Sequence, residues 1–189
     1  MNATWILLGV LLIALIVVGT IIGIYNKLVD FKNKVKESSS DIDVQLKRRY
    51  DLIPNLVETV KGSTNFESGT LEKVVKARQQ AIDTTGMGAD KVAAENMLSG
   101  TLRQLFALSE SYPDLKSNEN FLSLQTELAN TEDRILASRR FFNTVVSDYN
   151  TFQTQFPAVL FRSLAGAKEE EFFELEDPAT ERKNPQVKF

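Results

Sequence analysis

The sequence contains no cysteine and no histidine. Without cysteine the chain has no disulfide, no thiolate nucleophile and no thiolate ligand for zinc. Without histidine it lacks a Ser-His-Asp triad, an imidazole general base and the commonest protein ligand of transition metals. These absences exclude most nucleophilic enzymes and most metal centres, so the sequence predicts a protein that is not an enzyme and that carries no cofactor.

The sequence also lacks an excess of positive charge, which is the usual mark of nucleic-acid binding. Its net charge is −3, and residues 166–189 hold seven acidic and four basic side chains, which accounts for that whole charge. We therefore expect no nucleic-acid partner. The acidic tail over 166–189 is expected to be partly disordered, with Phe172 and Phe173 docking on the helical domain or on another chain.

A long apolar run lies near the N-terminus. Residues 5–24 contain no charged side chain, and a helix of this length spans roughly 30 Å, the hydrocarbon thickness of a bilayer. A buried core helix usually keeps a polar face over this length, and a cleavable signal peptide needs a basic start, which residues 1–4 lack. Residues 1–24 are therefore predicted to be a retained single-pass transmembrane anchor.

The basic residues near this run predict its orientation. Lys27, Lys32, Lys34 and Lys36 follow the run, and no basic side chain precedes it. Because cytoplasmic flanks are enriched in Lys and Arg, we expect the N-terminus outside and the domain in the cytoplasm, with the anchor in the plasma or inner membrane. Lys32, Lys34 and Lys36 are also candidate contacts for anionic lipid head groups.

Apolar residues then recur at seven-residue spacing, which is typical of long helices packed lengthwise. The longest series is Phe121, Leu128, Ile135, Phe142, Tyr149 and Phe156, and a second is Leu28, Val35, Ile42 and Leu56 with Arg49 interrupting it. Two shorter helices are expected over about 67–82 and 91–110. The predicted fold is all-α: the N-terminal transmembrane helix, followed over 25–165 by an antiparallel four-helix bundle with long, coiled-coil-like helices.

Prolines set the expected ends of these helices. Pro113 should close one helix and Pro157 should end the helix over 118–156. Pro54 falls inside the first long helix, where it should either bend the helix or start a new one with Asp51 as its N-cap.

Residues 47–57 form a candidate interaction surface. Its members are Lys47, Arg48, Arg49, Leu52, Ile53, Pro54, Leu56 and Val57. In a straight helix the basic triplet lies about 37 Å beyond the anchor, too far to sense the same bilayer, so it favours a solvated face or ion pairs with a neighbouring chain. The apolar members have two interpretations, the core of the bundle or a contact with another subunit.

The helices carry several glutamates, which raises the question of a carboxylate metal site. They are Glu58, Glu67, Glu72, Glu95, Glu110, Glu127 and Glu132. Di-metal bundles use Glu-x-x-His motifs, which this chain cannot form, so most of these side chains are expected in solvent. Glu127, with Asn130 and Glu132, is instead expected to make a polar contact within the bundle.

Several segments together resemble the LemA family of bacterial membrane proteins. They are DIDVQLKRRYDLIPNLVETVKG at 41–62, TLEKVVKAR at 70–78, YPDLKSNENFLSLQTELANTEDRI at 112–135, YNTFQTQFP at 149–157 and FFELE at 172–176. The resemblance implies one N-terminal membrane helix, an all-α domain and no established enzymatic activity. Two departures are Tyr50, where many members have histidine, and Asn65-Phe66-Glu67, where Ala-His-Glu is common.

Two functions follow as hypotheses. The first is a membrane-anchored scaffold that self-associates into a homo-oligomer and recruits protein partners, as yet unidentified, at the bilayer surface. The second is a membrane-tethered sensor or regulator that binds a small ligand and signals to a separate enzyme. The second ranks lower on sequence alone, because the pattern shows no convergent polar pocket.

Overall fold

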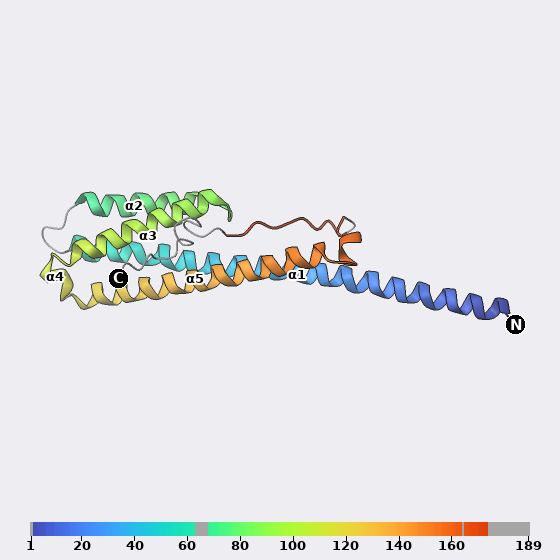
Figure 1. The fold of residues 1–189 in the computed structure, drawn as a ribbon. Coiled ribbons are helices and arrows are strands. Elements are labelled where there is room, and N and C mark those ends of the chain that lie inside the picture. The colour runs from blue at the N-terminus through green and yellow to red at the C-terminus, as the bar shows by residue number, and fades with distance from the viewer. Residues whose placement is uncertain (1, 63–67, 164, 174–189) are drawn as a thin grey trace, which may run out of the picture. The chain divides into compact units, whose positions relative to one another are not determined.

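A computed structural model describes residues 2–62, 68–163 and 165–173 (Figure 1). All the regular elements in these residues are helical: α1 (Asn2–Lys61), α2 (Ser68–Asp83), α3 (Ala89–Ser109), α4 (Pro113–Lys116), α5 (Glu119–Thr154) and the 3-10 helix η1 (Ala158–Leu160). The predicted all-α class with a long apolar N-terminal helix is confirmed. Glu67 and the tail beyond Phe173 lie outside the described residues.

The chain divides into two compact units. Unit 1 comprises Met1–Ser40 and Phe141–Glu170, and unit 2 comprises Asp41–Arg140 and Glu171–Phe189. The domain expected over 25–165 therefore contributes residues to both units. Both α1 and α5 continue from one unit into the other.

The N-terminal part of α1 has the properties of a membrane span. Its most apolar window has a mean hydropathy of 3.0 and none of that window is buried within the chain. From Ala3 onward, Ile24 is the first buried residue. Because a helix satisfies its own backbone hydrogen bonds and these side chains are apolar, α1 is long and apolar enough to cross a bilayer.

Unit 1 packs the next part of α1 against the end of α5. Leu28 and Val35 are buried on α1. Between them, the Phe31 ring centroid lies 5.3 Å from that of Phe152 and 6.5 Å from that of Tyr149. The series of seven-residue spacings therefore marks the buried face of both helices here. Phe156 departs from it, since α5 ends at Thr154 and Phe156 is 80% exposed.

Unit 2 has a core built from five helices. The core residues are Ile53, Leu56, Val57 and Val60 on α1, Leu71, Val74, Ala77 and Ala81 on α2, Ala94, Leu98, Leu102 and Leu105 on α3, Leu115 on α4, and Phe121 and Leu128 on α5. In the same unit Phe173 is buried, with the Arg139 guanidinium 4.5 Å from its ring centroid, whereas Phe172 is 48% exposed.

Pro54 does not start a new helix, so that alternative is wrong. α1 runs through Pro54 to Lys61, and the Asp51 carboxylate pairs with Lys47 at 2.5 Å. Proline has no N–H, so it cannot donate to the Tyr50 carbonyl four residues earlier. The Arg78 side chain of α2 supplies the missing donor, because its Nε donates to Tyr50 O at 2.8 Å. A contact between helices thus allows the proline inside α1.

Candidate functional site

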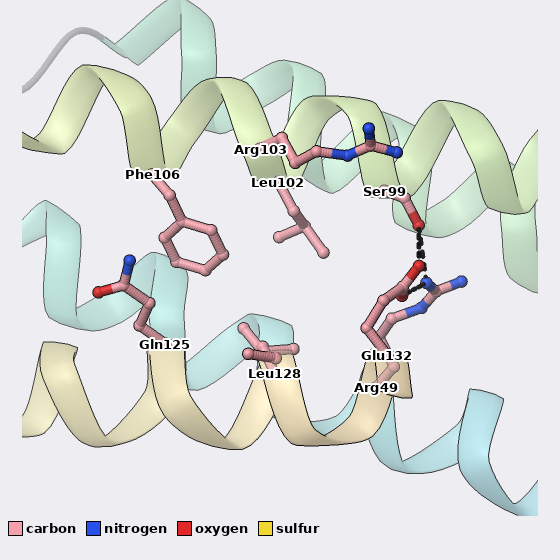
Figure 2. A pocket seen from close by; sticks show the side chains of 9 residues that line it. Arg49, Ser99, Leu102, Arg103, Phe106, Gln125, Leu128 and Glu132 are labelled. Carbon is pink, nitrogen blue, oxygen red and sulfur yellow. Dashed lines mark hydrogen bonds and ion pairs between the residues drawn. The ribbon is translucent and has the colours of Figure 1, made fainter. Parts of the chain in front are cut away.

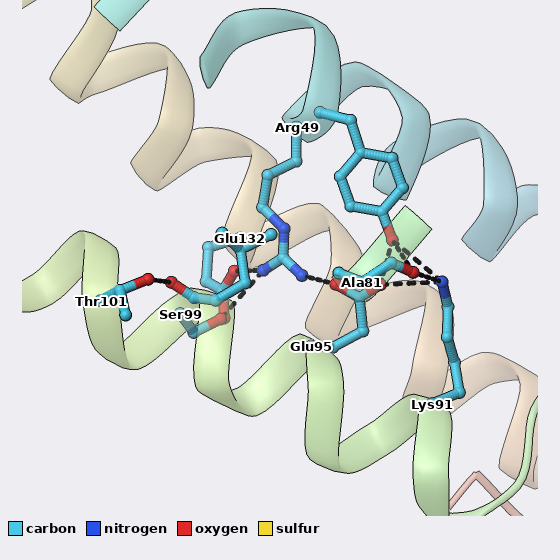
Figure 3. Close-up of polar contacts among 9 residues, drawn as sticks. Arg49, Ala81, Lys91, Glu95, Ser99, Thr101 and Glu132 are labelled. Carbon is cyan, nitrogen blue, oxygen red and sulfur yellow. Dashed lines mark hydrogen bonds and ion pairs between the residues drawn. The ribbon is translucent and has the colours of Figure 1, made fainter. Parts of the chain in front are cut away.

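Arg49 lies at the centre of a buried polar network in unit 2 (Figure 3). Its side chain is 1% exposed, and its position on α1 belongs to the seven-residue series that is otherwise apolar. Arg49 Nη1 donates to Glu132 Oε2 of α5 at 2.6 Å and to Ser99 Oγ of α3 at 2.9 Å. Its Nη2 donates to Glu95 Oε2 of α3. One guanidinium therefore bridges three helices.

Glu95 extends the network to a second cation. Its other oxygen, Oε1, accepts a hydrogen bond from the Tyr50 hydroxyl and lies 3.0 Å from Lys91 Nζ. Lys91 Nζ also donates to the Ala81 carbonyl at the end of α2, at 2.7 Å. Lys91, Glu95 and Ser99 are spaced four residues apart, so one face of α3 carries all three polar groups.

The four charged groups balance one another. Arg49 and Lys91 provide two positive charges, and Glu95 and Glu132 two negative ones. Removing water from such charges is costly, and a network of this kind persists because each group keeps its partners. Arg49, Lys91 and Glu95 are buried, and removing one of these three leaves a buried partner without part of its counter-charge, which typically costs about 3–5 kcal/mol. The network therefore fixes how α1, α3 and α5 are paired in unit 2.

The Tyr50 hydroxyl shares this environment. Burial raises the pKa of Tyr50 well above its ordinary value of 10.0, and the hydrogen bond to Glu95 raises that pKa further. The phenol is therefore held in its neutral form, as a donor to the carboxylate.

A pocket of about 250 Å³ opens beside this network (Figure 2). Figure 2 shows Leu102 and Phe106 of α3 facing Leu128 of α5 across the apolar part of the pocket. Arg49, Ser99 and Glu132 border its polar end, and Arg103, Gln125 and Ala129 complete the lining. Arg49 Nε is buried and has no hydrogen-bond partner within the described residues. Apolar walls with a few polar groups at one end are typical of a small-molecule site.

The structure places the predicted interaction surface in two different environments. Arg49, Ile53, Leu56 and Val57 are buried, because they face the core and the network, and they are not available to another chain. Lys47, Arg48 and Pro54 are exposed and Leu52 is half-buried. The expectation that Arg49 lies on a solvated face or pairs with a neighbouring chain is therefore wrong. Lys47, Arg48, Leu52 and Pro54 remain a predicted interaction surface.

The other predicted groups have mixed outcomes. Lys32, Lys34 and Lys36 are exposed on α1 of unit 1, and Lys34 pairs with Asp30 at 3.1 Å. Lipid contact by these lysines remains a prediction. Of the group around Glu127, Glu132 bonds to Arg49 of α1 and Glu127 lies 3.8 Å from Arg48 of α1, so both make polar contacts between helices. Glu95 is buried, contrary to the expectation of solvent exposure for most glutamates. In the described part of the chain, no group of three or more acidic side chains is placed to hold a metal ion.

Comparison with known proteins gives one family and several relatives. The LemA family model matches residues 38–189. Protein LemA of Metamycoplasma hominis is 28% identical over 130 residues, which cover 69% of this chain and 59% of that protein. Magnetosome protein MamQ of Magnetospirillum gryphiswaldense is 24% identical over 180 residues, which cover 82% of this chain and 66% of that protein.

A third relative gives a similar result. Magnetosome protein MamQ 2 of Paramagnetospirillum magneticum is 25% identical over 187 residues, covering 86% of this chain and 68% of the relative. The chain thus spans between 59% and 68% of the length of these curated relatives. None of their names describes an enzymatic activity.

Proposed function

Because the chain belongs to the LemA family and carries an apolar helix of bilayer length, we propose that it is a membrane-anchored binding protein that senses a small amphipathic molecule. The observation that carries this proposal is the pocket beside Arg49, with apolar walls and a polar end held by a buried network. The pocket reverses the ranking of the two hypotheses drawn from the sequence. Ligand binding in unit 2 would regulate a separate enzyme or partner at the membrane.

The size of the pocket limits the ligand. A cavity of about 150 Å³ is known to hold one benzene molecule, so a pocket of about 250 Å³ suits a single ring, or a short alkyl chain, with one small head group. The ring would pack on Leu102, Phe106 and Leu128. The head group would lie near Ser99 and Arg49.

The charges at the pocket indicate the chemistry of the head group. Two arginines, Arg49 and Arg103, and one carboxylate, Glu132, line the pocket. An acceptor such as a carboxylate or an amide is therefore favoured as the head group. An ammonium head group of the same size would approach two guanidinium groups and is disfavoured.

Thermal unfolding of the full chain in lipid nanodiscs tests this proposal. We expect benzoate and benzamide to raise the melting temperature and benzylamine to leave it unchanged, since a ligand that binds only the folded state stabilises it. Ala129 is exposed and lines the pocket, so Ala129→Trp should block the mouth and abolish the shift.

The matched control is Ala137→Trp, at another exposed alanine of α5 that does not line the pocket. This variant should keep the shift. Equal shifts in the two variants, or no shift with any of the three compounds, would contradict ligand binding at this pocket.

The scaffold is the second candidate function. Unit 2 exposes several large apolar side chains outside its core, namely Val44, Val75, Met97 and Leu122. Anchors that confine several copies of the chain to one membrane raise the effective concentration of those copies. Contacts that are too weak to cause association in solution would then be sufficient for a homo-oligomer and for recruitment of protein partners. The exposed Lys47, Arg48 and Pro54 would contribute to that surface. Light scattering of detergent-extracted protein tests this; a clean monomer at working concentration argues against it.

The finer architecture and the orientation belong to the same proposal. We infer that the long helices of unit 2 form an antiparallel four-helix bundle with coiled-coil-like packing, since α1, α2, α3 and α5 all contribute to one core. We also place the domain in the cytoplasm, on the basis of Lys27, Lys32, Lys34 and Lys36. Protease treatment of intact spheroplasts would degrade an external domain and leave a cytoplasmic one intact.

A further inference from the structure

Three large apolar side chains stand exposed at the end of α5 and in η1. Phe156 is 80% exposed, Leu160 is 66% exposed and Val159 is 43% exposed. We call these three residues the apolar tip of unit 1. Clustered exposed apolar residues on an otherwise packed unit usually mark a contact with another molecule or with a membrane.

The apolar tip lies close to the level at which the apolar run of α1 ends. Figure 1 shows α5 ending beside the part of α1 that follows this run, with the two helices in opposite directions. Phe152 packs on Phe31 at a centroid distance of 5.3 Å. Two further residues of helix advance α5 by about 3 Å to its end at Thr154, at the level of about residue 29 of α1, and Phe156 follows two residues later.

The packed part of unit 1 begins where the lipid-facing part of α1 stops. Ile24 is both the last residue of the apolar run and, from Ala3 onward, the first buried one. The apolar tip thus lies at the depth where the hydrocarbon of the membrane gives way to head groups, if α1 crosses the bilayer with residues 5–24.

Basic side chains flank the apolar tip in the same unit. Lys27 follows the apolar run, with its Nζ 5.1 Å from the Phe31 ring centroid. Arg162 and Lys168 follow η1 in the sequence, and Arg162 lies 3.7 Å from Glu169. Exposed aromatic and aliphatic residues bordered by Lys and Arg are the composition that binds the interfacial region of anionic membranes.

We propose that Phe156, Val159 and Leu160 form a second membrane contact, inserted into the interface of the same bilayer that α1 crosses. This inference rests on α1 being a membrane anchor and does not depend on ligand binding in unit 2. The molecule that covers the apolar tip is lipid, because the tip lies close to the level at which the lipid-facing part of α1 ends. Unit 1 is then attached to the membrane at two points, and its height above the bilayer is fixed.

Fluorescence quenching by brominated lipids tests this contact. The chain has one tryptophan, Trp5, so Trp5→Phe provides a background in which a single new tryptophan reports on its own depth. Phe156→Trp and Leu160→Trp place that probe at exposed positions of the apolar tip, where little packing is disturbed. Both variants are reconstituted as full chains in vesicles of brominated phosphatidylcholine and phosphatidylglycerol, and in matched vesicles without bromine.

The matched control is Phe141→Trp, because Phe141 lies on α5 in the same unit and is 56% exposed. We expect loss of fluorescence and a blue shift at positions 156 and 160, and neither at position 141. Unquenched probes at both tip positions, or equal quenching at position 141, would overturn the proposal. Trp5 of the parent chain reports on the anchor separately. If Trp5 is quenched and the two tip probes are not, only the second membrane contact is refuted. If Trp5 is not quenched, the anchor and the second contact are both refuted.

Discussion

Residues 3–23 of α1 and the polar network of unit 2 reverse the usual placement of side chains. The first region exposes its Leu, Ile and Val side chains, and none of its residues is buried by the chain. The second region buries an arginine, a lysine and a glutamate inside a helical core, where Arg49 and Glu95 are each 1% exposed. The comparison shows that hydropathy alone does not decide which residues of this chain are buried.

The difference has a physical cause in each region. Apolar side chains on α1 require an apolar solvent, and the hydrocarbon of a bilayer provides it. Charged side chains in unit 2 require counter-charges, and α3 and α5 provide them at hydrogen-bond distance. Each region thus depends on a partner, lipid in one case and protein in the other, and each can be tested by removing what it depends on.

The largest effect is expected from Glu95→Ala. This change leaves Arg49 and Lys91 without their shared carboxylate, and we expect a loss of about 3–5 kcal/mol in the free energy of unfolding. Urea titration of the full chain in nanodiscs measures this loss. Glu72→Ala, at an exposed glutamate of α2, should change stability by no more than about 0.5 kcal/mol. Similar losses in both variants would show that the network is not a paired, buried unit.

A charge in the anchor should have the next largest effect. Leu12 and Val44 lie on the same helix and are 60% and 62% exposed. Leu12→Arg should raise the apparent free energy of membrane insertion by about 3 kcal/mol, because a guanidinium at the centre of a span is poorly tolerated. Val44→Arg should leave insertion unchanged. A translocon insertion assay measures both, and equal effects would contradict the assignment of the span.

A smaller effect concerns Pro54 and Arg78. Arg78→Leu removes the donor to the Tyr50 carbonyl and should cost about 1–3 kcal/mol, since a partly buried acceptor loses its partner. In a Pro54→Ala background, the new N–H of residue 54 can donate to the same carbonyl, so Arg78→Leu should cost about 1 kcal/mol less. A double-mutant cycle of unfolding free energies measures this coupling. Strict additivity would rule out the compensation.

The smallest effect is a pH dependence from Tyr50. Its pKa is raised in the folded state by burial and by Glu95, so the folded chain keeps a proton that the unfolded chain loses above about pH 10. The free energy of unfolding should therefore fall as the pH rises above about 10, and this part of the stability is fully present below that value. Tyr50→Phe should fall less steeply in parallel urea titrations. Identical slopes would contradict the burial of the phenol.

The sequence predicted the long helices well, because seven-residue spacing is a local signal. The expected helix over 118–156 corresponds to α5 at Glu119–Thr154, and the series through Leu28 and Ile42 marks the buried face of α1. The same spacing also contained a sign of the site, since Arg49 falls between Ile42 and Leu56. An arginine at a core position must be buried with a counter-charge, so the interruption of the apolar series itself indicates a buried polar site.

The partners of Arg49 could not be identified from local pattern. Glu95 and Glu132 are 46 and 83 residues away in the sequence, and only tertiary packing brings them together. The spacing of Lys91, Glu95 and Ser99 gives one face of α3 but does not reveal what that face meets. The pocket depends on how Phe106 of α3 and Leu128 of α5 face each other, which no periodicity encodes. At Phe156 the local pattern was misleading. The seven-residue series of apolar residues includes Phe156, although α5 ends before it, at Thr154.

Cysteine labelling in native membranes tests the contrast between the two regions most directly. The chain has no cysteine, so Leu12→Cys, Ala94→Cys and Val44→Cys each provide a single thiol, in the anchor, in the core of unit 2 and on an exposed face. With a water-soluble maleimide we expect Val44→Cys alone to react in buffer. In urea, Ala94→Cys should become reactive while Leu12→Cys stays protected by lipid. Reaction of Leu12→Cys without detergent, or of Ala94→Cys without urea, would contradict the account.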